Sequence, residues 1–80
     1  MIDEVKKKRM QVESDVIAGP FLRLPLAQLA SVRELLNRHG IYYWVDSEAI
    51  SMDHKPPVIY INFGRKGNAA QIQAILDEAG

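Results

Sequence analysis

Four side chains suited to metal binding and proton transfer stand close together in the middle of the chain. Asp46, Glu48, Asp53 and His54 all fall in the segment 46–54. Carboxylates and an imidazole can ligate a metal ion or share a proton. Their spacing matches no ligand pattern, however, and all four are expected in a loop. We interpret them as surface residues, and we expect a protein with no cofactor and no enzymatic activity.

A second group of residues is suited to an anion. The segment 64–68 places Arg65 and Lys66 between two glycines, directly before a predicted helix that Asn68 caps. Free backbone N–H groups at the start of a helix attract phosphate or carboxylate. Arg65 adds a bidentate donor and Lys66 a point charge. The hypothesis is an anion-binding site made of Arg65, Lys66, Gly67 and Asn68. The alternative is a solvated connection whose glycines serve the turn.

The third group is aromatic and lies on two predicted strands, residues 41–45 and 58–63. Side chains alternate between the two faces of a sheet. If the odd-numbered residues of both strands face the helices, the other face carries an apolar patch of Tyr42, Trp44, Val58 and Tyr60. Such patches often mark contact surfaces, and Tyr and Trp dominate interface energetics. The opposite assignment of faces would bury Trp44 in the core.

The aromatic patch predicts a homodimer in which two copies meet through their open sheet faces. Stacking of a ligand or of nucleic-acid bases on the same aromatic residues is the alternative. Nucleic acid is disfavoured, because ten Lys and Arg are balanced by ten Asp and Glu and phosphate neutralisation needs an excess of cations. The glycine-aromatic motif of RNA-recognition sheets is also missing.

The elements that must position these residues follow in a readable order. A hairpin or one bent strand is expected over residues 10–24. A helix then begins near Pro25, carries a buried stripe of Leu26, Leu29, Val32 and Leu36, and ends at Gly40 in a left-handed conformation. After the strand at 41–45, residues 46–57 form a hairpin loop with a short extra strand at 49–52. The strand at 58–63 and a helix from Asn68 complete the chain.

This order predicts an α+β fold, a ferredoxin-like βαββα sandwich with an antiparallel sheet and two helices on one face. The strand at 58–63 is expected in the middle of the sheet. Residues 10–80 then form a single domain. Residues 1–9 are expected to be a charged tail or a short helix, and Lys6 to Arg9 suggest, as an alternative, a basic arm for an anionic partner. Asp3 and Glu4 offset part of that charge.

The layout also resembles a family of small prokaryotic proteins grouped as signal-transducing, which are short uncharacterised domains. Over residues 16–80 the resemblance is carried by Leu35-Leu36, by Gly40-Ile41, and by the strand, variable hairpin and final helix that follow. The family has no established catalytic residues to transfer. The resemblance therefore implies a binding or regulatory module.

Length and composition set the remaining expectations. The chain has 80 residues and no cysteine, so neither disulfides nor thiolate metal sites can reinforce a small core. Dimerisation would add buried surface. No apolar run reaches the roughly 20 residues that span a bilayer, and the charged N-terminus does not match a signal peptide. We expect a cytoplasmic protein without a membrane partner.

Overall fold

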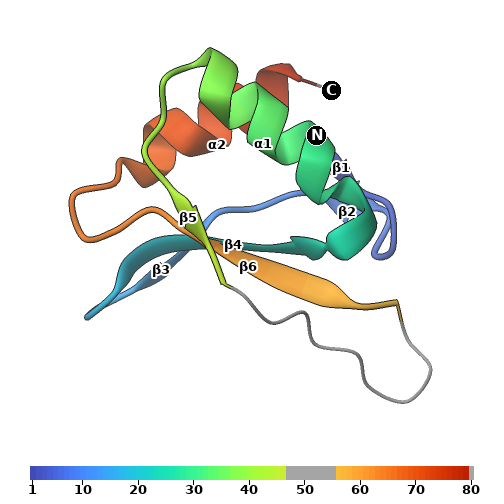
Figure 1. Ribbon diagram of the computed structural model, residues 1–80, viewed down its shortest axis with the longest axis horizontal. Helices are drawn as coiled ribbons and strands as arrows, with labels where there is room; N and C mark the ends of the chain where they lie inside the picture. The colour runs from blue at the N-terminus through green and yellow to red at the C-terminus, as the bar shows by residue number, and fades with distance from the viewer. Residues whose placement is uncertain (47–55, 80) are drawn as a thin grey trace.

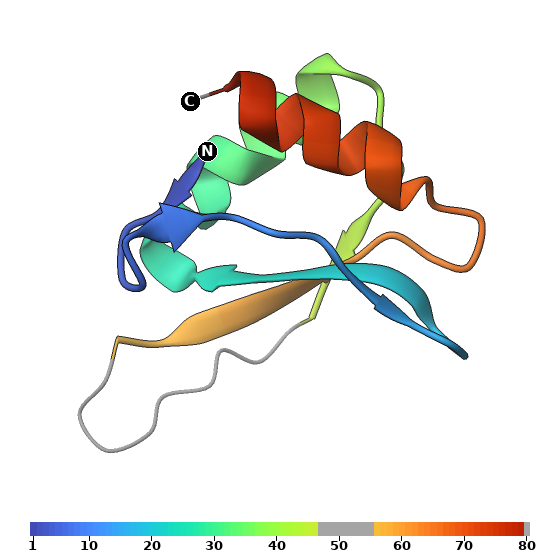
Figure 2. The ribbon, with the colours of Figure 1, turned by 180° about the vertical axis from the view of Figure 1, so that it is seen from behind.

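The computed structural model describes residues 1–46 and 56–79, which form an α+β unit with two antiparallel sheets and two α-helices. Within these residues one sheet has four strands in the order β3-β4-β6-β5, and the other is the pair β1-β2. Both helices lie on the same side of the larger sheet (Figures 1 and 2). The strands are β1 (Ile2–Asp3), β2 (Lys8–Arg9), β3 (Glu13–Asp15), β4 (Gly19–Pro25), β5 (Trp44–Val45) and β6 (Val58–Asn62), and the helices are the 3-10 turn η1 (Leu26–Gln28), α1 (Leu29–Arg38) and α2 (Ala69–Glu78).

The α+β class is confirmed, and so is the central place of the strand predicted at 58–63. β6 pairs antiparallel with β4 on one side and with β5 on the other. The ferredoxin-like βαββα arrangement is not confirmed, because the sheet topology differs. Four strands precede the first helix, and two of them form a separate sheet. The expected extra strand at 49–52 lies outside the described residues.

The core lies between the larger sheet and the two helices. Leu22 and Ile61, which are register partners in β4 and β6, are fully buried. Val32 and Leu36 of α1 and Leu76 of α2 cover them with no exposed surface of their own. Burying each such side chain stabilises the fold by about 1.5–3 kcal/mol. The same alternation places the remaining side chains of these strands on the helix-free face.

Helix α1 begins later than expected. Pro25 is the last residue of β4 rather than a first-turn residue, and Leu26 belongs to η1 and is 38% exposed. The end of the helix is as predicted: Gly40 has φ +67°. The N–H of Ile41 donates to the carbonyl of Leu36, and the N–H of Gly40 donates to that of Asn37. This paired bonding is the Schellman motif that a left-handed glycine permits.

The prediction for residues 1–9 is wrong: they form neither a tail nor a helix but the hairpin β1-β2. Asp3 pairs with Lys8, and the Asp3 carboxylate accepts the N–H groups of Val5 and Lys6, both at 2.9 Å. The turn contains Lys7 at φ +59°. The spacing of Ile2, Val5 and Val12 is compatible with one face of a helix, but the turn that Asp3 closes determines the structure of this segment instead.

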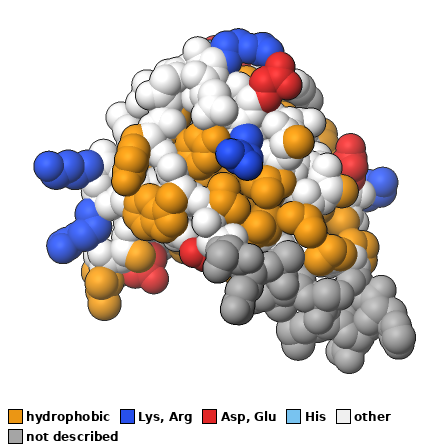
Figure 3. Space-filling model, viewed as in Figure 1, with side chains coloured by type: hydrophobic (Ala, Val, Ile, Leu, Met, Phe, Trp, Pro, Cys, Tyr) orange, Lys and Arg blue, Asp and Glu red, His pale blue; other side chains and the backbone are white. Residues whose placement is uncertain are grey.

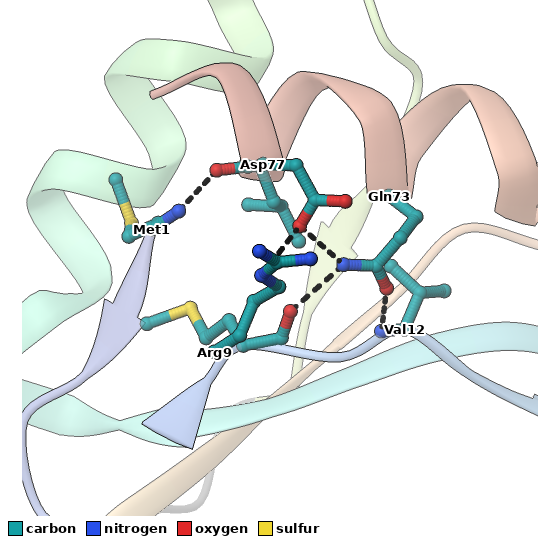
Figure 4. Close-up of polar contacts among 7 residues, drawn as sticks. Met1, Arg9, Val12, Gln73 and Asp77 are labelled. Atoms are coloured by element: carbon teal, nitrogen blue, oxygen red, sulfur yellow. Dashed lines mark hydrogen bonds and ion pairs between the residues drawn. The ribbon is translucent and has the colours of Figure 1, made fainter. Parts of the chain in front are cut away.

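Residues far along the chain hold this hairpin in place. The buried Gln28 side chain donates to the carbonyl of Ile2 at 2.8 Å and accepts the N–H of Glu4 at 2.9 Å. Figure 4 shows the contacts with α2, where the N-terminal amine of Met1 donates to the carbonyl of Leu76. These partners give the backbone of the segment hydrogen bonds that a free terminus would make with water.

In the part of the chain that the structure describes, no helix has both the length and the apolar character needed to cross a bilayer.

Candidate functional site

The helix-free face of the larger sheet carries most of the predicted aromatic patch. Trp44 is the register partner of Asn62, whereas Val45 is the partner of the buried Ile61. Trp44 therefore faces away from the helices, and the alternative that buries it in the core is wrong. Tyr60 and Val58 share this face, because they alternate with the buried Ile59 and Ile61.

We use the name open face for the outward side chains of three strands and the residue that follows β5. Its members are Phe21, Arg23, Trp44, Asp46, Val58, Tyr60 and Asn62.

Phe21 belongs to the open face, although it is not part of the patch predicted from the sequence. It is opposite Asn62 across β4 and β6, and its ring centroid is 6.1 Å from that of Tyr60. This spacing suits a tilted aromatic pair. The signal was available in the sequence, because Leu22 and Leu24 face inward and strict alternation then sends Phe21 outward.

Exposure differs among the aromatic residues. Trp44 keeps 45% of its surface exposed and Tyr42 keeps 76%, while Phe21, Tyr60 and Val58 are half-buried. Tyr42 precedes β5 and lies at the rim of the open face, where its ring centroid is 6.0 Å from that of Trp44. Two aromatic pairs, Phe21 with Tyr60 and Tyr42 with Trp44, therefore reach solvent on and at the rim of the open face.

Hydrophobic surface also continues past the edge of the sheet. Among residues 1–46 and 56–79, β5 pairs only with β6 and forms one edge of the larger sheet. In Figure 3, hydrophobic side chains form a band that starts in the region of β5 and follows the space between α1 and β6. Exposed apolar surface next to an open strand edge is a feature of association sites.

The open face has a simple charge arrangement. Arg23 is exposed and lies opposite Tyr60 across β4 and β6. On the other side of Tyr60, the N–H of Asp46 donates to the Tyr60 carbonyl at 3.0 Å, which continues the β5-β6 ladder. A row of cation, aromatic ring and carboxylate thus crosses three neighbouring strands.

The glycine-rich segment before α2 is a tight turn with its own structural requirements. The N–H of Gly67 donates to the carbonyl of Gly64 at 3.0 Å. A Cβ at Gly67 would lie 2.9 Å from the Cβ of Phe63, so packing alone requires glycine there. Asn68 caps α2 by accepting the N–H of Gln71 at 3.0 Å. The Gly67 N–H and the Asn68 side-chain oxygen are therefore already engaged.

The four residues proposed for the anion site are only partly brought together. Lys66, Gly67 and Asn68 line a cavity of about 290 Å³ together with His39 and Tyr42, between the end of α1 and the start of α2. Arg65 is exposed and does not line this cavity. The site is left with Lys66 as the cation that faces it.

The polar group at 46–54 is described only in part. Asp46 is exposed on the open face, as above, whereas Glu48, Asp53 and His54 lie outside the described residues. Within residues 1–46 and 56–79, no three His, Asp or Glu side chains gather closely enough to hold a metal ion.

Comparisons of the chain with protein-family models, with curated proteins and with solved structures gave no match. The resemblance to the small prokaryotic signal-transducing proteins therefore stays a prediction.

Proposed function

We propose that this domain is a non-enzymatic interaction module that forms a homodimer through the open face. The observation that carries the proposal is the exposure of Trp44 and Tyr42 beside Tyr60 and Phe21 on and at the rim of a helix-free sheet face. Aromatic side chains bury 150–250 Å² each in typical contacts and dominate interface energetics. The arrangement of β4, α1, β5, β6 and α2 also supports our view of the domain as a variant of the ferredoxin-like unit.

The charge row across the open face favours a second copy of this chain as the partner. A two-fold axis close to Tyr60 would bring Arg23 of one protomer towards Asp46 of the other, and the same pair would form twice. An isologous interface requires a surface that is complementary to itself in this manner. Among the described residues, Arg23 and Asp46 take part in no ion pair, so both are free for such a contact.

Light scattering coupled to size-exclusion chromatography tests the proposal. We expect a molar mass near twice the chain's 9.0 kDa for the wild type and a shift towards monomer for Trp44→Ala. Ile17→Ala is the control, because Ile17 is an exposed apolar residue on the β3-β4 turn and outside the open face. A folded wild type that stays monomeric at millimolar concentration would rule out the dimer.

A charge exchange identifies the geometry of the dimer. Arg23→Asp and Asp46→Arg should each weaken the dimer, because like charges then face one another across the axis. The double variant should recover at least part of the wild-type association. If the double variant is as weak as the sum of the single changes, the two residues do not meet across the interface.

The second candidate function is binding of a small anion beside Lys66. The cavity of about 290 Å³ between the helix ends favours it. Phosphate should then raise the melting temperature of the wild type and have a smaller effect on Lys66→Gln. Equal effects on the two proteins would exclude Lys66 from the site.

A further inference from the structure

A cavity of about 380 Å³ lies between the N-terminal hairpin and β4, away from every residue assigned a role above except Arg23. Four cations line it: Lys6, Lys8, Arg9 and Arg23. The carboxylates among its lining residues are Asp3 and Glu13. The chain as a whole has no net charge, so this concentration of cations in one cavity is a local property of the fold.

The two carboxylates offset only part of the positive charge that the four cations bring to the cavity. Asp3 is only 6% exposed, and its Oδ1 atom already accepts the N–H groups of Val5 and Lys6. The charge of Arg9 is balanced by a residue that does not line the cavity, because the Arg9 Nε lies 3.6 Å from the Oδ1 of Asp77 (Figure 4). Lys6, Lys8 and Arg23 form no ion pair with any described residue. Asp3 and Glu13 are the carboxylates that line the cavity with these three cations, which leaves an excess of positive charge.

The walls of the cavity are held in place from two sides. On one side, Gln28 clamps the hairpin through Ile2 and Glu4. On the other, the Gln73 side chain of α2 donates to the carbonyl of Met10 at 2.9 Å and accepts the N–H of Val12 at 2.8 Å (Figure 4). The backbone that carries the cations is thus ordered before any ligand arrives, which lowers the entropic cost of binding.

We propose that this cavity binds a small polyanion, such as pyrophosphate or a phosphorylated small molecule. Lysine ammonium groups act as strong point charges for phosphate, and the Arg23 guanidinium can bind two phosphate oxygens at once. The volume falls at the lower end of the range of about 300–1,000 Å³ that is typical of small-molecule sites. A compact group of three free cations suits a small ligand better than a nucleic acid, which requires a basic stripe along its backbone.

Titration calorimetry with inorganic pyrophosphate, at low ionic strength, tests the proposal. The test variant is the double change Lys6→Gln and Lys8→Gln, because Arg23 also belongs to the open face. Both lysines are exposed, so their substitution leaves the core intact. The matched control removes the same charge elsewhere, with Arg33→Gln and Arg38→Gln on the exposed side of α1.

We expect saturable binding to the wild type and to the control, and a loss of affinity of about tenfold or more in the Lys6/Lys8 variant. An equal loss of affinity in both variants would show that overall charge, and not this cavity, attracts pyrophosphate. The absence of measurable binding to the wild type would disprove the proposed site. If a single-stranded oligonucleotide binds more tightly than pyrophosphate, with a steep salt dependence, the ligand is a nucleic acid and the proposal of a small polyanion is wrong.

Discussion

The indole of Trp44 lies against Gly64. The Cζ3 atom of the ring is 3.5 Å from the position that a Cβ at residue 64 would occupy, and Gly64 has φ +79°. The exposed aromatic residue of the open face therefore rests on the first glycine of the turn that leads to α2. This contact joins the two regions for which the sequence predicted separate functions.

Substitutions at Gly64 should separate backbone strain from displacement of the ring. We expect Gly64→Ala to lower the free energy of unfolding by about 1–2 kcal/mol, because alanine is strained at positive φ, while its Cβ only touches the indole. The branches of Gly64→Val would overlap the ring and move it into water. The fluorescence of Trp44, the one tryptophan of the chain, should then shift to the red in Gly64→Val but not in Gly64→Ala. Identical spectra for the two variants would contradict the contact.

Gly19 and Gly40 form a second matched pair. Both have positive φ. A Cβ at Gly19 would overlap the carbonyl oxygen of Gly64, whereas a Cβ at Gly40 would meet no atom of the described residues within 4 Å. Gly40→Ala should cost about 1–2 kcal/mol through conformation alone. Gly19→Ala should cost about 1–3 kcal/mol more, since the backbone must move apart. Urea denaturation measures both, and equal losses would show that the β3-β4 turn does not pack against the segment at Gly64.

Gln28 should be a stabilising residue of the N-terminal hairpin. Gln28→Leu removes the partners of the Ile2 carbonyl and the Glu4 N–H. We expect a loss of about 1–3 kcal/mol and faster hydrogen exchange at Glu4. Gln71→Leu is the control, because Gln71 is exposed and contributes its backbone N–H rather than its side chain to the cap of α2. If exchange at Glu4 is unchanged in Gln28→Leu, the clamp does not hold the hairpin.

The β3-β4 turn should respond to acid. The N–H groups of Ala18 and then Ile17 donate to the Asp15 carboxylate and hold its pKa below the ordinary value of 3.8. A lowered pKa means that the carboxylate stabilises the turn above its unfolded-state pKa and stops doing so as the pH falls through the folded-state value. Nuclear magnetic resonance titration should place the Asp15 midpoint below 3.8. The amide chemical shifts of Ile17 and Ala18 should change with the same midpoint. A midpoint above the ordinary value would show that the two hydrogen bonds do not stabilise the carboxylate.

Local chemistry in the sequence was enough to predict several parts of the fold. Gly40 ends α1 and Asn68 caps α2 because the groups that satisfy a helix end lie within a few residues of it. The apolar character of residues 58–63 on both faces predicted a central strand, whereas the inward direction of Ile59 and Ile61 was one of two alternatives that the sequence left open. With the helix spacing of Val32 and Leu36, these signals determined the α+β class.

Tertiary structure decided what depended on distant partners. No local pattern shows that Gln28 and Gln73 supply hydrogen bonds to residues 2–12, so the sequence predicts a tail or a short helix where the structure has the hairpin β1-β2. The face that carries Trp44 depended on its register with Asn62, because a shift of one residue would turn the side chain to the other side. The cavity lined by Lys6, Lys8 and Arg23 exists because that hairpin is held beside β4. The sequence alone thus determined those elements whose hydrogen-bond partners lie within a few residues. Packing between segments far apart in the chain decided which side chains meet.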